Sequence, residues 1–357
     1  MSDQLYLFGA PDPPPAEPHP VDRQLADRHA RGQALAARLP EALAFGTSSW
    51  TFPGWAGLVY PRGLTGAALG REGLRHYARH PLLRTVGIDR SYYAPMPLDD
   101  LAAYADALPD GFLACIKAPA SVTSRVLPSF GAARDQRPAD NPDFLSVDRL
   151  VADLLEPLAA GFLAHSGPIV LEFPPGARAR DQAPPAFLER LDVFLESLPR
   201  EFQYAVEIRD RALLLPEYAA LLARRGVAHT YNYWSAMPMP LAQAAVVSPE
   251  DQPFLITRLL LKPGTWYEDQ RDRFTPFNRL VEPDEPMRDE VVELTRRALA
   301  RGRKVYVLVN NKAEGSSPLT VEALAARIAA ALDGDAARQA GPIADPDGRP
   351  PAPGARD

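Results

Sequence analysis

The stretch Tyr204–Asp210 (YAVEIRD) decides how the fold is interpreted. It begins as the apolar run typical of a buried parallel strand and then acquires charged residues before any turn residue. Because side chains alternate along a strand, Glu207 and Arg209 share one face, and Val206 and Ile208 share the other. The C-terminal mouth of a parallel α/β barrel accommodates such a pair. A functional site and a structural ion pair that closes the barrel end both remain open.

Short apolar runs alternate with helical patterns on both sides of this stretch. The predicted strands are Ala44–Ser48, Thr85–Asp89, Phe112–Lys117, Ile169–Phe173, Gln203–Ile208, Val227–Asn232, Leu255–Leu261 and Lys304–Val309. The predicted helices cover 68–79, 97–108, 146–160, 185–198, 213–225, 239–247, 286–301 and 318–332. Eight strands alternating with eight helices predict a single (β/α)8 TIM-type barrel. An open doubly wound sheet is the competing architecture.

The composition divides the chain into a barrel and two tails. Residues 41–332 form the predicted barrel. Residues 1–40 form a flexible, proline-rich N-terminal extension with a weak amphipathic helix over 22–39. Residues 333–357 are rich in Pro, Gly, Asp and Ala, which predicts a disordered C-terminal tail.

Charge and cysteine content limit the environment and the partners. The net charge of −6 does not favour wholesale electrostatic binding of nucleic acid. The single cysteine, Cys115, excludes an intrachain disulfide and a multi-cysteine zinc site, and it suits a reducing cytosol. No run of about 18 apolar residues and no signal peptide is present, so we expect a cytoplasmic protein without a membrane partner.

Polar residues at the strand ends should surround one mouth of the barrel. The candidate catalytic residues are Glu207, Asp89, Lys117 and Glu172. The candidate substrate-binding residues are Arg209, Arg258 and Lys262 for a phosphate, Trp50 and Tyr92 for stacking, and Asn310 and Asn311. The alternative is that these charges pair with one another and plug the barrel.

Cofactor motifs do not identify the chemistry. A P-loop and a Gly-x-Gly-x-x-Gly turn are absent, so there is no nucleotide-cofactor motif, and His-x-x-x-His spacing is missing. A divalent cation, Mg²⁺ or Mn²⁺, on Asp89, Glu172 and Glu207 stays open, because such ions need only oxygen ligands. Lys117 is either a Schiff-base lysine or an ion-pair partner of Glu207 or Glu172.

Several blocks of this sequence match a known family. They are GTSSWTFPGWAGLVYP (46–61), IDRSYYAP (88–95), KAP (117–119), FPP (173–175), EIRD (207–210) and VNNKAEGSSP (309–318). The chain thus resembles the YecE-like family, also called domain of unknown function 72, which implies a TIM-type barrel without an established activity. Two departures are Asp89-Arg90-Ser91, where the family usually has a Glu-Ile-Asn-type strand end, and Glu172, where it often has Gln.

Two hypotheses of function follow. The first is an enzyme acting on a phosphate-bearing sugar, nucleotide or nucleic-acid end. The second is a non-catalytic ligand-binding or adaptor protein. The N-terminal peptide adds a partner to the second hypothesis, because it resembles the Gln-Leu-x-Leu-Phe peptide that docks on the bacterial sliding clamp. The matching residues are Gln4, Leu5, Leu7 and Phe8. The alternative is an apolar tail that folds back onto the barrel.

Overall fold

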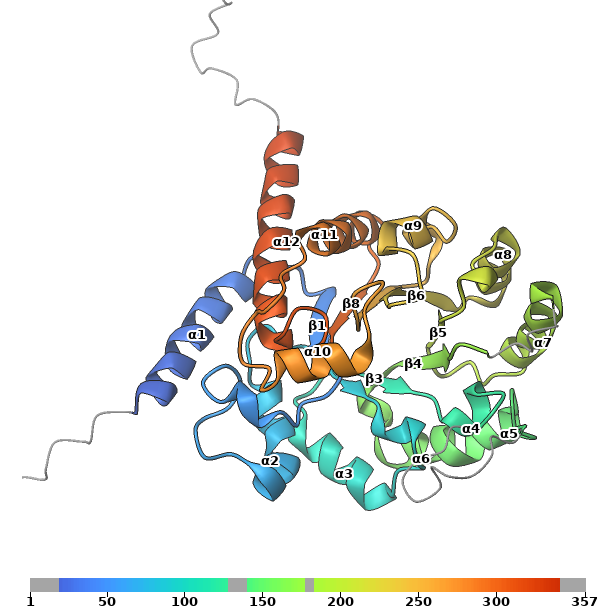
Figure 1. The fold of residues 1–357 in the computed structure, drawn as a ribbon, viewed down its shortest axis with the longest axis horizontal. Coiled ribbons are helices and arrows are strands. Elements are labelled where there is room, and N and C mark those ends of the chain that lie inside the picture. The colour runs from blue at the N-terminus through green and yellow to red at the C-terminus, as the bar shows by residue number, and fades with distance from the viewer. Residues whose placement is uncertain (1–18, 128–139, 177–182, 341–357) are drawn as a thin grey trace, which may run out of the picture.

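Eight parallel strands curve into a nearly closed barrel with helices around it (Figure 1). The computed structural model describes residues 19–127, 140–176 and 183–340. The strands are β1 (Leu43–Thr47), β2 (Gly87–Ile88), β3 (Ala114–Lys117), β4 (Ser166–Phe173), β5 (Tyr204–Ile208), β6 (Ala228–Tyr233), β7 (Leu255–Leu259) and β8 (Val305–Val309). Their spatial order follows the chain, with β8 beside β1, so the predicted TIM-type barrel is confirmed.

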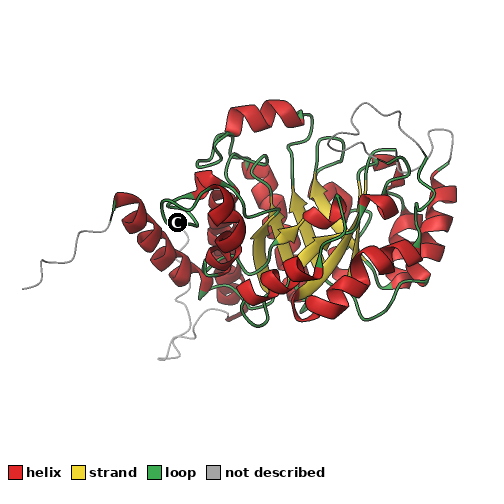
Figure 2. Cartoon of the chain, turned by 90° about the horizontal axis from the view of Figure 1, so that it is seen from below, coloured by secondary structure: helices red, strands yellow, loops and turns green. Residues whose placement is uncertain are grey.

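Helices separate the strands along the chain, and most of them cover the outside of the barrel (Figures 1 and 2). They are α1 (Pro20–Ala36), α2 (Gly66–Ala78), α3 (Leu98–Ala107), α4 (Ala120–Thr123), α5 (Val147–Leu150), α6 (Glu156–Gly161), α7 (Pro184–Glu196), α8 (Pro216–Arg225), α9 (Pro240–Ala244), α10 (Tyr267–Phe274), α11 (Glu285–Ala300) and α12 (Ser317–Ala340). Within the described ranges, no helix combines the length and apolar character needed to cross a membrane.

Strand alternation separates two apolar layers. Outward side chains such as Leu171, Val206 and Ile208 join the large cluster between the strands and the helices. Inward side chains such as Val170 and Ala205 form a smaller cluster that fills the lower part of the barrel. The barrel is therefore a packed core at its N-terminal end, and only the opposite end is available for polar groups.

The seam between β1 and β2 is the weakest part of the barrel wall. It is joined by a parallel bridge between Phe45 and Leu83 and by bonds of 2.8 and 3.1 Å from the backbone N–H groups of Arg84 and Thr85 to the Phe45 carbonyl. A Cβ atom at Gly46 would lie 2.2 Å from the Thr85 carbonyl oxygen. Glycine is thus required at position 46 for the close approach that closes the barrel.

The helix predicted over 146–160 is interrupted. A π-helical turn over Val151–Leu155 separates α5 from α6. Pro157 follows this turn and has no N–H to donate to a carbonyl four residues earlier, which accounts for the local change of helix type.

The helix predicted over 22–39 is present as α1, whereas the start of the predicted C-terminal tail differs from the structure. The N-terminal extension includes α1, which packs on α12 with Arg28 donating to Glu322 at 2.8 Å. Helix α12 continues eight residues past the predicted end at 332, where Arg296 binds Asp335 at 2.7 Å. Ion pairs with distant parts of the chain, which composition does not reveal, stabilise these turns. Residues 1–18 and 341–357 lie outside the described residues.

Two matched Gly→Ala variants test the seam. Gly46→Ala should lower the free energy of unfolding by about 2–3 kcal/mol, because the added methyl group forces the strands apart. Gly70→Ala, exposed in α2 with nothing within 4 Å of its added Cβ, should raise it by about 0.5–1 kcal/mol. Urea unfolding measures both. Equal stability of the Gly46→Ala variant and the wild type would show that the seam is not tightly closed.

Candidate functional site

The register of two neighbouring strands creates the central electrostatic problem of the barrel mouth. Residues Glu172 of β4 and Glu207 of β5 are direct partners in the sheet, and both belong to the inward-facing set. Their side chains are 3% and 0% exposed. Like charges opposite each other destabilise a sheet, and buried carboxylates need compensation. Cations must therefore lie between or above these two groups.

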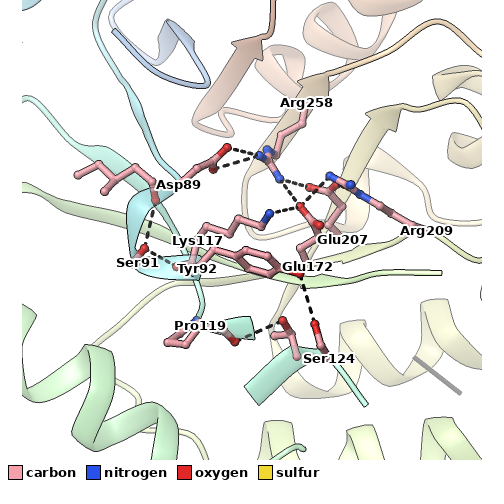
Figure 3. Close-up of polar contacts among 12 residues, drawn as sticks. Asp89, Ser91, Tyr92, Lys117, Pro119, Ser124, Glu172, Glu207, Arg209 and Arg258 are labelled. Carbon is pink, nitrogen blue, oxygen red and sulfur yellow. Dashed lines mark hydrogen bonds and ion pairs between the residues drawn. The ribbon is translucent and has the colours of Figure 1, made fainter. Parts of the chain in front are cut away.

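Six charged side chains meet this need and form what we call the charge layer (Figure 3). Three are carboxylates and three are cations. They come from β3, β4, β5 and β7 and from the residues directly after β2 and β5: Asp89, Lys117, Glu172, Glu207, Arg209 and Arg258. The formal charges sum to zero. The structure thus brings together all four candidate catalytic residues and both predicted phosphate-binding arginines.

Glu172 is the hub of the charge layer. Its Oε2 atom accepts from Lys117 Nζ at 2.7 Å, from Arg209 Nη2 at 2.7 Å and from Arg258 Nη1 at 3.3 Å. Burial raises the pKa of this carboxyl, but the three cations outweigh burial and lower the pKa to about 2. Glu172 therefore stays ionised at neutral pH, and its negative charge fixes the positions of the cations.

Arg258 connects opposite sides of the mouth. Its Nη1 atom donates to Glu207 and Glu172, and its Nη2 atom lies 3.3 and 3.5 Å from the two carboxylate oxygens of Asp89. Burial lowers the pKa of the guanidinium, but Glu207, Asp89 and Glu172 together raise it above its ordinary value. Arg209 completes the layer by donating from Nε to Glu207 Oε1 at 2.9 Å.

Exposure within the layer increases from the centre toward Asp89. The side chains of Lys117 and Arg209 are 9% and 13% exposed, whereas that of Asp89 is 33% exposed. A ligand at the mouth can thus reach Asp89 first and then the outer edges of Lys117 and Arg209.

Aromatic rings hold two of the cations. Tyr92 lies beneath Lys117, whose Nζ is 3.6 Å from the ring centroid, and its hydroxyl is 3.3 Å from Ser124 Oγ. Burial, followed by the Glu172 charge, raises the pKa of Tyr92 to about 12. Trp234 covers Arg209, with 4.1 Å between the guanidinium carbon and the ring centroid. These contacts orient the cations without neutralising them.

Two of the predicted ligand-binding residues, Trp50 and Lys262, have their partners outside the charge layer. Trp50 is buried in the apolar core, edge-on to Tyr104 at 5.2 Å. Lys262 pairs with Glu282 and Asp284, each at 3.2 Å. The prediction placed both at the mouth because they follow strands, but strand alternation does not determine where a loop side chain points.

The two asparagines after β8 serve the turn into α12. Asn310 accepts from the backbone N–H of Lys312 at 3.0 Å. Asn311 is buried, and its Oδ1 accepts from Trp55 Nε1 at 3.3 Å and from the N–H of Ser317 at 2.8 Å. Their spacing in the sequence is therefore explained by the geometry of the turn.

Three residues of the site are not among the candidate residues predicted from the sequence. Ser91 donates to the Lys117 carbonyl at 2.6 Å and ties the segment after β2 to β3. Ser124 and Trp234 support Tyr92 and Arg209. Trp234 follows the end of β6 directly, and this position at a strand end was the available sequence signal.

Metal binding at the carboxylates has no support in the described ranges. No group of three or more His, Cys, Asp or Glu residues there is arranged to hold a metal ion. Guanidinium and ammonium groups already contact Asp89, Glu172 and Glu207.

A cavity of about 740 Å³, lined by Ala44, Lys304 and other residues where strands begin, lies at the opposite end of the barrel.

Comparison with known proteins identifies the family to which the chain belongs. The model of the family described as "Protein of unknown function DUF72" matches residues 44–342, and the chain belongs to this family. The matching region includes every residue of the charge layer.

Solved structures of this family share the fold. A DUF72 family protein from Enterococcus faecalis V583 is 15% identical, with a TM-score of 0.52, over 82% of this chain and 97% of that one. Another, from Thermotoga maritima MSB8, is 19% identical, with a TM-score of 0.51, over 82% and 99%. No curated protein matches the chain.

The depressed pKa of Glu172 predicts acid sensitivity. A carboxyl with a folded-state pKa of about 2, against an ordinary value of 4.5, stabilises the fold fully above pH 4.5 and loses this contribution as the pH falls toward 2. The loss should approach roughly 3 kcal/mol. The charge-neutral double variant Glu172→Gln/Lys117→Met is the control. Its unfolding free energy should fall less steeply over this range, and identical slopes would contradict the assignment.

Proposed function

We propose that the protein is an enzyme that acts on a phosphate-bearing sugar, nucleotide or nucleic-acid end at the C-terminal mouth of the barrel. The change inside the barrel, from an apolar cluster to six charges, supports this proposal. Apolar side chains fill the lower part of the barrel. A buried network of ion pairs often stabilises a fold no more than well-packed apolar side chains would, so stability alone does not explain the charges. Charges at the end where barrel enzymes hold their substrates favour a functional role.

Arg209 and Lys117 are suited to hold the phosphate. Arg209 uses Nε and Nη2 for Glu207 and Glu172, and its Nη1 donates to no residue in the described part of the chain. A planar guanidinium fixed in this way presents its remaining N–H groups in a set direction. Lys117 lies on the other side of the Glu172 carboxylate and adds a second donor.

The three carboxylates then take different roles. Glu172 and Glu207 are buried and position the cations. Asp89 is one-third exposed and meets Arg258 only at 3.3–3.5 Å, so it can exchange a proton with a ligand hydroxyl or leaving group. We therefore assign proton transfer to Asp89. A cytoplasmic location, suggested by the single Cys115, belongs to the same proposal.

A ligand screen followed by two pairs of variants tests this function. Sugar phosphates and nucleotides should raise the thermal midpoint of the wild type, because a ligand that binds the native state stabilises it. Arg209→Lys keeps the charge but loses Nη1, so the affinity should fall about tenfold. Arg211→Lys, at an exposed position, should bind like the wild type.

Asp89→Asn separates binding from reaction. It should retain the ligand-induced shift while conversion of the ligand, followed by NMR, slows by about 10²–10⁴-fold. Asp99→Asn, exposed at the start of α3, is the matched control. Conversion by Asp89→Asn at the wild-type rate would remove Asp89 from the chemistry. The absence of any ligand-induced shift in the wild type would count against a phosphate site at the mouth.

The pairing of the charges in the layer with one another favours the second candidate function, a non-catalytic ligand-binding or adaptor protein. Each charge of the layer has an opposite charge within 3.3 Å, which is also how a structural plug is arranged. Such a protein could be recruited to the sliding clamp through Gln4, Leu5, Leu7 and Phe8, which lie outside the described residues. Helix α1 begins at Pro20 and connects this peptide to the barrel.

Clamp docking predicts that a peptide of residues 1–20 binds a bacterial sliding clamp at tens of micromolar or tighter in a fluorescence titration. The Leu7→Ala/Phe8→Ala peptide should lose binding, because these two side chains supply the apolar contacts. Equal binding by both peptides, or binding by neither, would leave the barrel without a link to DNA replication or repair.

A further inference from the structure

Three large aromatic side chains are exposed where the chain leaves strands β2 and β7. Trp266 is 76% exposed, Tyr93 60% and Tyr267 46%. We call them the aromatic rim. Exposed aromatic side chains that lie close together mark surfaces that bind ligands or partners.

Helix α10 carries one side of the aromatic rim above the barrel mouth. It stands beyond the carboxyl ends of the strands, apart from the outer helices (Figures 1 and 2). Its buried Gln270 and Phe274 anchor it, and Trp266 and Tyr267 lie at its N-terminal end. Lys312, after β8, places Nζ 4.3 Å from the Tyr267 ring centroid. Two aromatic side chains of this helix and the neighbouring Lys312 thus lie above the barrel mouth.

Tyr93 links the aromatic rim to the charge layer. Its ring lies edge-on to Tyr92 at 5.4 Å, and Tyr92 supports Lys117. Partial burial raises the pKa of Tyr93, and Asp89 and Tyr267 raise it further, as expected for a ring between the layer and α10. A ligand whose phosphate contacts Lys117 would therefore have its other end beside Tyr93.

We propose that the ligand of the mouth is a nucleotide, whose planar base stacks on the aromatic rim while its phosphate contacts Arg209 and Lys117. This inference rests on the proposed phosphate site. A nucleotide carries the two features that the mouth can recognise separately, an anion and a flat π-surface. The rim favours a single nucleotide or a chain end over a long strand, because the acidic residues of α10 outnumber its two arginines and the protein has a net charge of −6.

Paired ligands test the stacking contribution by itself. Calorimetric titrations compare AMP and UMP with ribose 5-phosphate, which has the same sugar and phosphate but no base. Stacking should make the nucleotides bind about tenfold or more tightly. In the double variant Tyr93→Ala/Trp266→Ala, both nucleotides should bind as weakly as ribose 5-phosphate, whose affinity should not change. Val193→Ala, at an exposed position on α7, is the control and should match the wild type.

The outcomes separate this inference from the proposed function. Equal affinities for nucleotides and ribose 5-phosphate in the wild type would overturn the stacking role and leave the phosphate site in place. An equal loss for all three ligands in the double variant would also overturn it. If none of the three binds the wild type, both proposals fail. The exposed positions of the replaced rings should leave thermal stability nearly unchanged, which an unfolding curve verifies.

Discussion

The in-register pairing of Glu172 and Glu207 is the constraint on which the rest of the mouth depends. Two carboxylates side by side in a poorly solvated interior repel each other strongly, and neither is exposed enough for water to relieve the repulsion. Arg209 and Arg258 each contact both of them, so the guanidinium groups serve as shared counter-charges. The register of β4 and β5 thus requires cationic residues at the end of β5 and on β7, which faces them across the barrel.

Neutrality of the charge layer limits the ligands that the mouth can bind. An anion that approaches Arg209 and Lys117 also meets the field of the carboxylates that hold them, so charge alone attracts it weakly. Binding must therefore draw on directional N–H groups, on hydrogen bonds to Asp89 and on contacts outside the layer. Trp234 on one side of Arg209 leaves a limited approach, which makes shape as important as charge.

Strand alternation predicted the charge layer well, and it failed where the backbone leaves the strands. It placed Glu207 and Arg209 on one interior face and brought Asp89 and Lys117 to the same mouth, as the structure shows. Trp50, Lys262 and Asn311 were assigned by their nearness to strand ends, but each is positioned by a partner far away in the sequence. Helix α10 has a largely charged sequence without an apolar stripe, so periodicity could not predict it.

Family membership agrees with the fold of this chain, but a fold does not determine an activity, which depends on the particular residues of the mouth. The glutamate at position 172, where the resemblance led us to expect glutamine in many relatives, illustrates this. A glutamine there would leave three cations facing two carboxylates, and an anionic ligand would restore neutrality. In this chain Glu172 already supplies that negative charge and holds Lys117, Arg209 and Arg258 in place before any ligand arrives. Glu172 thus provides preorganised donors, which favours a ligand recognised by geometry and stacking over one recognised by charge alone.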